Sequence, residues 1–161
     1  MKDFIEQQGP AFLAHLLRRL ADELVNGAGS WYPSAGVTAP PRTISTLLAL
    51  EDHGPLGVTE LATMLRQSHP LVIVWIKELT ALSFIASKAH PGDGRKTLIR
   101  LTAKGKKEVG NVRKALLTME EASKHLMDEG GADVWASLWR IERACRKTTF
   151  AERLRQMEPD R

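Results

Sequence analysis

Residues 93–105 read DGRKTLIRLTAKG and join a tight turn, a β-strand and the start of a helix. The turn begins two residues earlier, at Pro91 in the sequence PGDG, a combination typical of hairpin loops. Short apolar stretches flank the turn at Phe84–His90 and Thr97–Thr102. We therefore predict a β-hairpin with its tip at Gly92–Arg95, followed at once by a helix.

Helical patterns precede this hairpin. Leucines at helical spacing predict an amphipathic helix over Pro10–Asn26, which we expect Gly27 and Gly29 to end. Three further helices are predicted between Pro41 and the hairpin. Their expected spans are Ile44–His53, Val58–Arg66 and, with Ser68 as N-cap, 69–83. The apolar stripe of the last of them is Val72, Trp75, Ile76, Leu79 and Leu82.

Two long helices are predicted after the hairpin, Ala103–Asp128 and Asp133–Gln156, separated by Gly130-Gly131. This order predicts a mainly α protein with a small β-hairpin wing, a winged helix-turn-helix with flanking helices. The flanking helices carry apolar faces that a monomer would leave exposed. We expect a single domain, with a winged helix-turn-helix module over 40–102 and dimerisation helices over 1–39 and 103–161.

Composition excludes several classes of protein. The 161 residues include one cysteine, Cys145, which rules out an internal disulfide and multi-cysteine zinc sites. Since Cys145 lies on an apolar helical stripe, we expect a buried thiol rather than a redox sensor. We find no phosphate-binding loop, metal-ligand spacing or catalytic triad, and no membrane span or signal peptide. We expect a cytoplasmic protein that is not an enzyme and holds no metal or cofactor.

The positive charge is concentrated around the hairpin. The whole chain has a net charge of +4, whereas residues 86–107 hold seven basic residues and only Asp93 as an acid. The basic residues are Lys88, Arg95, Lys96, Arg100, Lys104, Lys106 and Lys107. Such a local patch is typical of proteins that contact the phosphate backbone of DNA, although a solvated lysine-rich surface gives the same pattern.

Three stretches resemble the MarR family of transcriptional regulators. GPLGVTELATML at 54–65 is similar to the second and third helices of that family, and LTALSFI at 79–85 to the end of its recognition helix. The sequence at 93–105 resembles its wing signature, DxRxxxxxLTxxG. Ser83 stands where the family usually has glycine. The resemblance implies a homodimer that binds double-stranded DNA at a near-palindromic site.

The resemblance also implies roles for the wing residues. Arg95 would enter a minor groove at the hairpin tip, where the negative potential is focused. Asp93 would orient Arg95 through a charge-assisted hydrogen bond. Lys88, Lys96 and Arg100 are candidates for phosphate contacts, which position a protein without specifying a sequence.

The recognition helix has an unusual outer face. Its polar candidates for base contacts are Gln67, Ser68, His69 and Lys77, accompanied by Pro70 and Ile73. In the MarR family, which this stretch resembles, the outer positions usually carry side chains that form hydrogen bonds. The side chains of Leu71, Ile73 and Val74 have no hydrogen-bonding groups. Three interpretations stay open: contacts with thymine methyl groups, weak sequence selectivity, or a surface that binds protein. We expect low discrimination between DNA sites.

The resemblance further implies release of DNA by a small aromatic anion. Candidate residues for binding such an effector are His15, Trp31, Tyr32 and Arg42. The alternative is that Trp31 and Tyr32 only anchor their loop against the core, which we favour.

Overall fold

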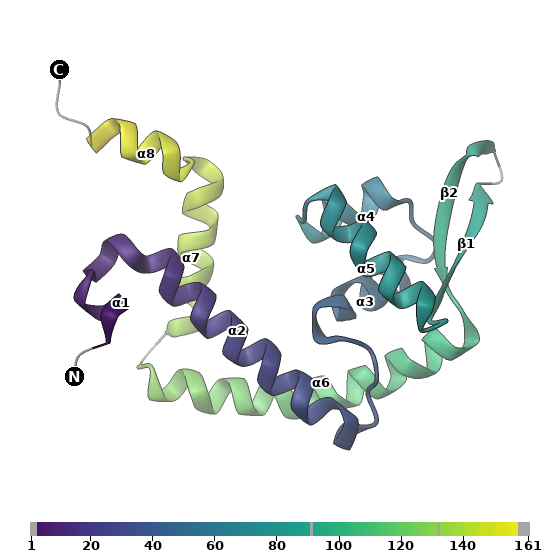
Figure 1. Cartoon of the computed structure of the whole chain (residues 1–161), viewed down its shortest axis with the longest axis horizontal. Helices are drawn as coiled ribbons and strands as arrows, with labels where there is room; N and C mark the ends of the chain where they lie inside the picture. The colour runs from purple at the N-terminus through teal and green to yellow at the C-terminus, as the bar shows by residue number, and fades with distance from the viewer. Residues whose placement is uncertain (1–2, 91, 132, 158–161) are drawn as a thin grey trace. The chain divides into compact units, whose positions relative to one another are not determined.

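A computed structural model describes residues 3–90, 92–131 and 133–157, without the side chains of residues 90 and 93–96. The chain divides into two compact units, residues 1–116 and 117–161. The first contains every helix before the hairpin, the hairpin itself and the first half of α6 (Figure 1). No helix in the described parts of the chain combines the length and apolar character that a membrane crossing requires.

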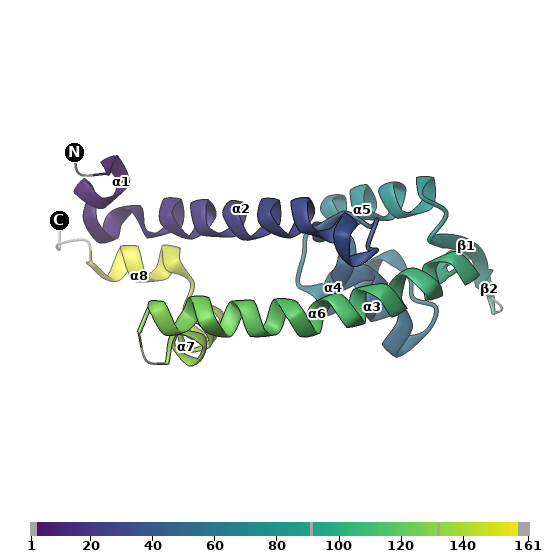
Figure 2. The same ribbon diagram turned by 90° about the horizontal axis from the view of Figure 1, so that it is seen from below.

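The first unit begins with a short helix, α1 (Phe4–Gln7), a 3-10 turn η1 (Gly9–Phe12) and the long helix α2 (Leu13–Trp31) (Figure 2). Our prediction that Gly27 and Gly29 end this helix is wrong, because α2 continues through both. Each glycine costs a helix only about 1 kcal/mol, and burial further along the chain outweighs that cost. Tyr32 and Val37 are almost completely buried, and the Val37 N–H donates to the Tyr32 carbonyl at 2.9 Å.

The helix-turn-helix follows two further 3-10 turns, η2 (Tyr32–Ala35) and η3 (Pro41–Thr43). It consists of α3 (Ile44–His53), α4 (Val58–Leu65) and α5 (His69–Ala81), which confirms the three predicted helices. These helices share one core with the base of the hairpin. Its largest fully buried apolar side chains are Leu47, Leu61, Val72, Leu79 and Phe84.

The hairpin is also confirmed, with antiparallel strands β1 (Ile85–His90) and β2 (Asp93–Leu101). It projects from the end of the module at which α5 finishes (Figures 1 and 2). The pairing is regular from Ile85↔Leu101 to Ala89↔Thr97, and a bulge then shifts the register between Ala89 and His90. Leu56 exchanges two backbone hydrogen bonds with Ile99, at 3.0 and 2.8 Å, and so joins the α3–α4 connection to the base of β2.

The second unit holds the end of α6 (Ala103–Glu129), α7 (Val134–Lys147) and α8 (Phe150–Met157). Our prediction of one continuous helix over 133–156 is wrong, because Thr148 is extended, at φ −141° and ψ 117°. Thr149 then starts α8 with a capping box: its N–H and hydroxyl each donate to the Glu152 carboxylate at 2.7 Å.

The side chain of Cys145 is exposed, which contradicts the expected buried thiol. The helical stripe on which it lies exists, but that stripe is itself exposed in the single chain. Trp135, Leu138 and Ile141 are 61%, 43% and 49% exposed.

Candidate nucleic-acid interface

Helix α5 has one face in the core and one face outside. Val72, Trp75 and Leu79 are buried, as their spacing predicted. At 100° per residue, Pro70, Val74 and Lys77 then fall on the opposite face. Val74 is 48% exposed. The helix therefore keeps a surface available for a partner after its own core contacts are complete.

The residues that lead into α5 are exposed as a group, and they include Gln67, Ser68 and His69. The turn between α4 and α5 depends on Arg66, which adopts a left-handed conformation at φ 52°. The Gln67 N–H then donates to the Ala62 carbonyl at 3.0 Å. Ser68 occupies the predicted N-cap position, but its hydroxyl makes no capping hydrogen bond, which leaves it available to a partner.

The hairpin presents two cations on one face. Ala86 pairs with Arg100 and Lys88 pairs with Leu98, so Lys88 and Arg100 lie on the same side of the sheet, diagonally across the strands. Both side chains are exposed. The backbone of Asp93, Arg95 and Lys96 belongs to β2, whereas their side chains lie outside the described residues.

Another cation of the basic patch has a structural contact. The Lys104 ammonium donates to the Leu82 carbonyl at 2.8 Å and lies 5.0 Å from the centre of the Phe84 ring. A lysine in this position joins the start of α6 to the end of α5. The patch available to phosphates is therefore smaller than the sequence count indicates.

The LTxxG end of the wing signature has a physical explanation. The Thr102 hydroxyl donates to the Ser83 carbonyl at 2.7 Å and accepts from the Gly105 N–H at 3.0 Å, so Thr102 caps α6. A Cβ atom at position 105 would lie 2.0 Å from the Phe84 carbonyl oxygen. The motif thus fixes the base of the hairpin against α6. Ser83 adopts a left-handed backbone conformation, at φ 61°. Glycine adopts this conformation with less strain, which fits the glycine expected at this position from the family resemblance.

No sequence pattern singles out Glu108, whose carboxylate is only 5% exposed. Its Oε1 atom accepts from the Thr38 N–H at 2.5 Å, the Ala39 N–H at 2.7 Å and the Thr38 hydroxyl at 3.2 Å. One turn later, the Asn111 amide donates to the Gly36 carbonyl at 2.8 Å. Residues 36–39 are thereby held against α6. A single acid in a helix gives no sequence signal for such a contact, because its partners lie about 70 residues away and two of the three are backbone groups.

The four candidate effector residues lie in different places. His15 stacks on Phe12, with 4.5 Å between the ring centres, whereas Trp31 contacts Tyr32 at 6.2 Å. His15 and Trp31 belong to the same helix, so about 24 Å of helix separates them. A small pocket within one chain does not include both. Burial raises the pKa of the Tyr32 hydroxyl.

Arg42 lines a cavity of about 550 Å³ between α2, the Pro40–Arg42 segment and α5. The other contributors include Asn26, Ser30 and Glu78. The Glu78 Oε2 atom is buried and has no hydrogen-bond partner among the described residues. Arg42 and Glu78 thus line the same cavity, where the guanidinium group of Arg42 suits a ligand with an anionic group.

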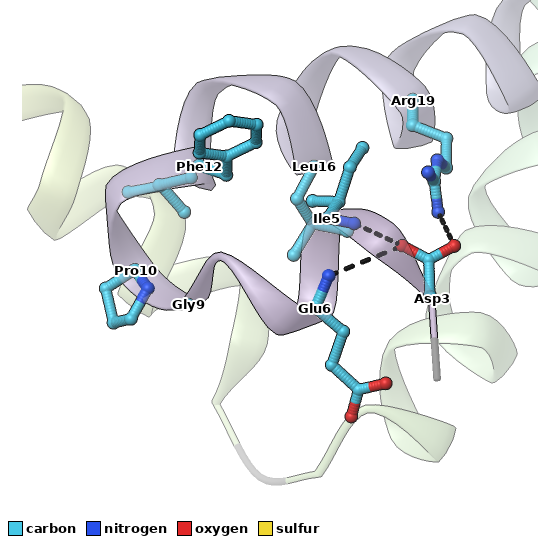
Figure 3. Close-up of a pocket in the computed structure, with 9 residues that line it drawn as sticks. Asp3, Ile5, Glu6, Gly9, Pro10, Phe12, Leu16 and Arg19 are labelled. Atoms are coloured by element: carbon cyan, nitrogen blue, oxygen red, sulfur yellow. Dashed lines mark hydrogen bonds and ion pairs between the residues drawn. The ribbon is translucent and has the colours of Figure 1, made fainter. Parts of the chain in front are cut away.

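A second cavity of about 450 Å³ lies where α1 folds back on α2 (Figure 3). Ile5, Phe12 and Leu16 give it an apolar lining, and Arg19 donates to the Asp3 carboxylate at 2.7 Å at its edge. This arginine lowers the pKa of Asp3, whose carboxylate also caps α1. None of the four candidate effector residues lines this cavity.

Comparisons with known proteins agree with this geometry. A model of the MarR family matches residues 40–97. The chain resembles a mutant MarR from E. coli complexed with operator DNA, at 17% identity and a TM-score of 0.68 over 89% of this chain and 98% of that one. It also resembles the PcaV transcriptional regulator from Streptomyces coelicolor in complex with its natural ligand, at 19% identity and a TM-score of 0.68 over 92% and 99%.

A third similar structure is BpsR from Bordetella bronchiseptica, whose DNA binding is regulated by 6-hydroxynicotinic acid. The identity is 25% and the TM-score 0.63, over 93% of this chain and 98% of that one. A search of curated protein sequences finds no match. The chain has the fold of the MarR-type transcriptional regulators, and its residues 40–97 match the model of the MarR family.

Proposed function

We propose that the protein is a DNA-binding transcriptional regulator that acts as a homodimer on a near-palindromic site. The observation that carries the proposal is the joint display of an exposed α5 face and a hairpin with Lys88 and Arg100 on one side. A helix of this kind fits the major groove, and cations on the hairpin suit the adjacent phosphates. In such a role the protein acts in the cytoplasm, where bacterial DNA lies.

The homodimer is supported by apolar surface that the single chain leaves exposed. On α2, Leu13, Leu16, Leu17, Leu20 and Leu24 are each 41–54% exposed. Burying the exposed half of each of these leucine side chains contributes roughly 0.7–1.5 kcal/mol, so a second copy that covers the stripe is favoured. A Leu17→Glu, Leu20→Glu variant should sediment as a monomer and lose affinity for DNA. Wild-type chain that sediments as a monomer would contradict the homodimer.

The DNA-binding role is tested by a mobility-shift titration over a range of salt concentrations. Affinity should fall steeply as salt rises, since phosphate contacts release counterions. Arg95→Ala should weaken binding about tenfold or more, while Lys114→Ala, which removes an exposed cation of α6, should leave it unchanged. An Arg95→Ala variant that binds as tightly as the wild type would remove the hairpin tip from the mechanism.

An aromatic anion that releases DNA is the regulatory part of the proposal. Of the four candidate residues, Arg42 is the one placed to bind such an anion, because it lines a cavity next to α5. Ligand in that cavity would change the equilibrium between conformations by its differential affinity for them. In a screen of aromatic acids, a compound that binds this cavity should raise the melting temperature of the wild type more than that of Arg42→Ala. Equal shifts in both proteins would place the ligand elsewhere.

A second candidate function is a protein-interaction module in which base recognition has degenerated. The exposed Leu71 and Val74 favour it, since apolar side chains are common at the centres of protein interfaces. The salt titration separates the two functions, because this alternative predicts no measurable affinity for any DNA duplex.

A further inference from the structure

The first half of α5 displays side chains without hydrogen-bonding groups. Residues 70–74 read PLVIV, and they follow immediately on the helix start at His69. Val72 is fully buried, whereas Leu71 and Val74 are 37% and 48% exposed. In a helix-turn-helix, this N-terminal half of the recognition helix is the part that contacts base edges.

The chemistry of base edges determines what such a surface can recognise. In the major groove, the bases present nitrogen and oxygen donors and acceptors together with one apolar group, the C5 methyl of thymine. An apolar side chain against a donor or acceptor leaves that polar group without its water and without a partner, which is unfavourable. Against a thymine methyl, the same side chain removes two apolar surfaces from water.

Charge around this surface favours DNA as its occupant. Lys77 lies on the same outer face of α5, and Lys88 and Arg100 are exposed on the neighbouring hairpin. Cations at the border of an apolar patch complement a groove whose floor carries methyl groups and whose edges carry phosphates. A protein partner would need acidic groups at matching positions to complement these cations, whereas the DNA backbone presents phosphates along its whole length.

We propose that α5 recognises thymine methyl groups through Leu71, Val74 and the half-buried Ile73, so that each operator half-site carries thymines where this helix enters the groove. The inference rests on the proposed DNA-binding function and specifies how that function selects its site. Discrimination of this kind is modest, because one methyl group transferred from water changes an equilibrium about fourfold.

The first experiment compares two duplexes that differ only in methyl groups. The tightest-binding duplex from a random-sequence pool is made once with thymine and once with deoxyuridine at every thymine position. The dissociation constant should rise about fourfold for each contact between α5 and a thymine methyl group that the deoxyuridine duplex lacks. The salt dependence should be the same for both duplexes, because the methyl group carries no charge and phosphate contacts are unchanged.

A double-mutant cycle then connects the methyl effect to the named side chains. With Val74→Ala or Leu71→Ala, the ratio of affinities for the thymine and deoxyuridine duplexes should move toward one. Met64→Ala is the matched control, because Met64 is 41% exposed on the neighbouring helix α4, and it should keep the wild-type ratio. Since the altered side chains are exposed, the variants should fold, which circular dichroism checks.

The outcomes separate this inference from the function on which it rests. Equal affinity for both duplexes overturns the thymine inference and leaves DNA binding intact. A deoxyuridine penalty that Val74→Ala and Leu71→Ala do not change also overturns it, since the methyl groups then act through the shape of the DNA. Absence of binding to any duplex overturns both and favours the protein-interaction module. A penalty that shrinks in both variants but not in Met64→Ala supports it.

Discussion

The buried carboxylate of Glu108 should contribute a large part of the stability of the first unit. One oxygen atom serves two backbone N–H groups and one hydroxyl, all from Thr38 and Ala39. Removing it by Glu108→Ala leaves the buried Ala39 amide and the part-buried Thr38 amide without an acceptor, and an unpaired buried amide costs about 1–3 kcal/mol. With the lost packing of the side chain, we expect a destabilisation of roughly 3–6 kcal/mol, a large share of the 5–15 kcal/mol typical of a domain.

Two matched variants resolve the cause. Glu108→Gln keeps an oxygen in the same place without its charge, and neutral hydrogen bonds have about half the strength of charged ones, so it should cost roughly 1–2 kcal/mol. Asn111→Ala removes one hydrogen bond, to the Gly36 carbonyl at 2.8 Å, and should cost about 1 kcal/mol or less. Denaturant unfolding, monitored by circular dichroism, measures all three. A Glu108→Ala variant within about 0.5 kcal/mol of the wild type would refute the reasoning.

Three further predictions concern the junctions between elements. Gly105→Ala should destabilise the protein by more than about 3 kcal/mol, because its Cβ would overlap the Phe84 carbonyl; a melting temperature close to that of the wild type would contradict this. Ser83→Gly should stabilise the protein by about 1 kcal/mol, since glycine adopts the positive φ of 61° without strain, and denaturant unfolding would show it. Hydrogen bonds from the hydroxyl and backbone of Thr149 lower the pKa of Glu152. The stability that these hydrogen bonds contribute is therefore present above the ordinary glutamate pKa and is lost as pH falls through the lowered value. In Thr149→Val, an NMR titration should show the pKa of Glu152 returning toward its ordinary range.

The elements that sequence predicted correctly are those fixed by local signals. A Pro-Gly-Asp-Gly turn between two apolar stretches identified the hairpin, and the spacing of Val72, Trp75 and Leu79 identified the buried face of α5. Both features depend on neighbours within a few residues. They can therefore be predicted without knowledge of the rest of the fold.

The elements that sequence mispredicted depend on distant contacts or on competing local signals. Glycine often ends a helix, but α2 continues through Gly27 and Gly29, and Tyr32, the residue that follows the helix, is buried. At Thr149 and Glu152 the sequence carries both a capping box and an apolar helical periodicity that continues across it, and in the structure the capping box prevails and starts a new helix. The acceptor role of Glu108 depends on a fold that brings residues 38 and 108 together, so no local pattern announces it.

The close approach of Gly105 to Phe84 has a mechanical consequence. No atom larger than hydrogen fits between the start of α6 and the carbonyl that precedes β1, so these two segments cannot slide past each other. The root of the hairpin must then turn with the first turns of α6 as one rigid corner. The direction in which β1 and β2 leave the module is therefore set by the start of α6, and a rotation of that helix would carry the base of the hairpin with it.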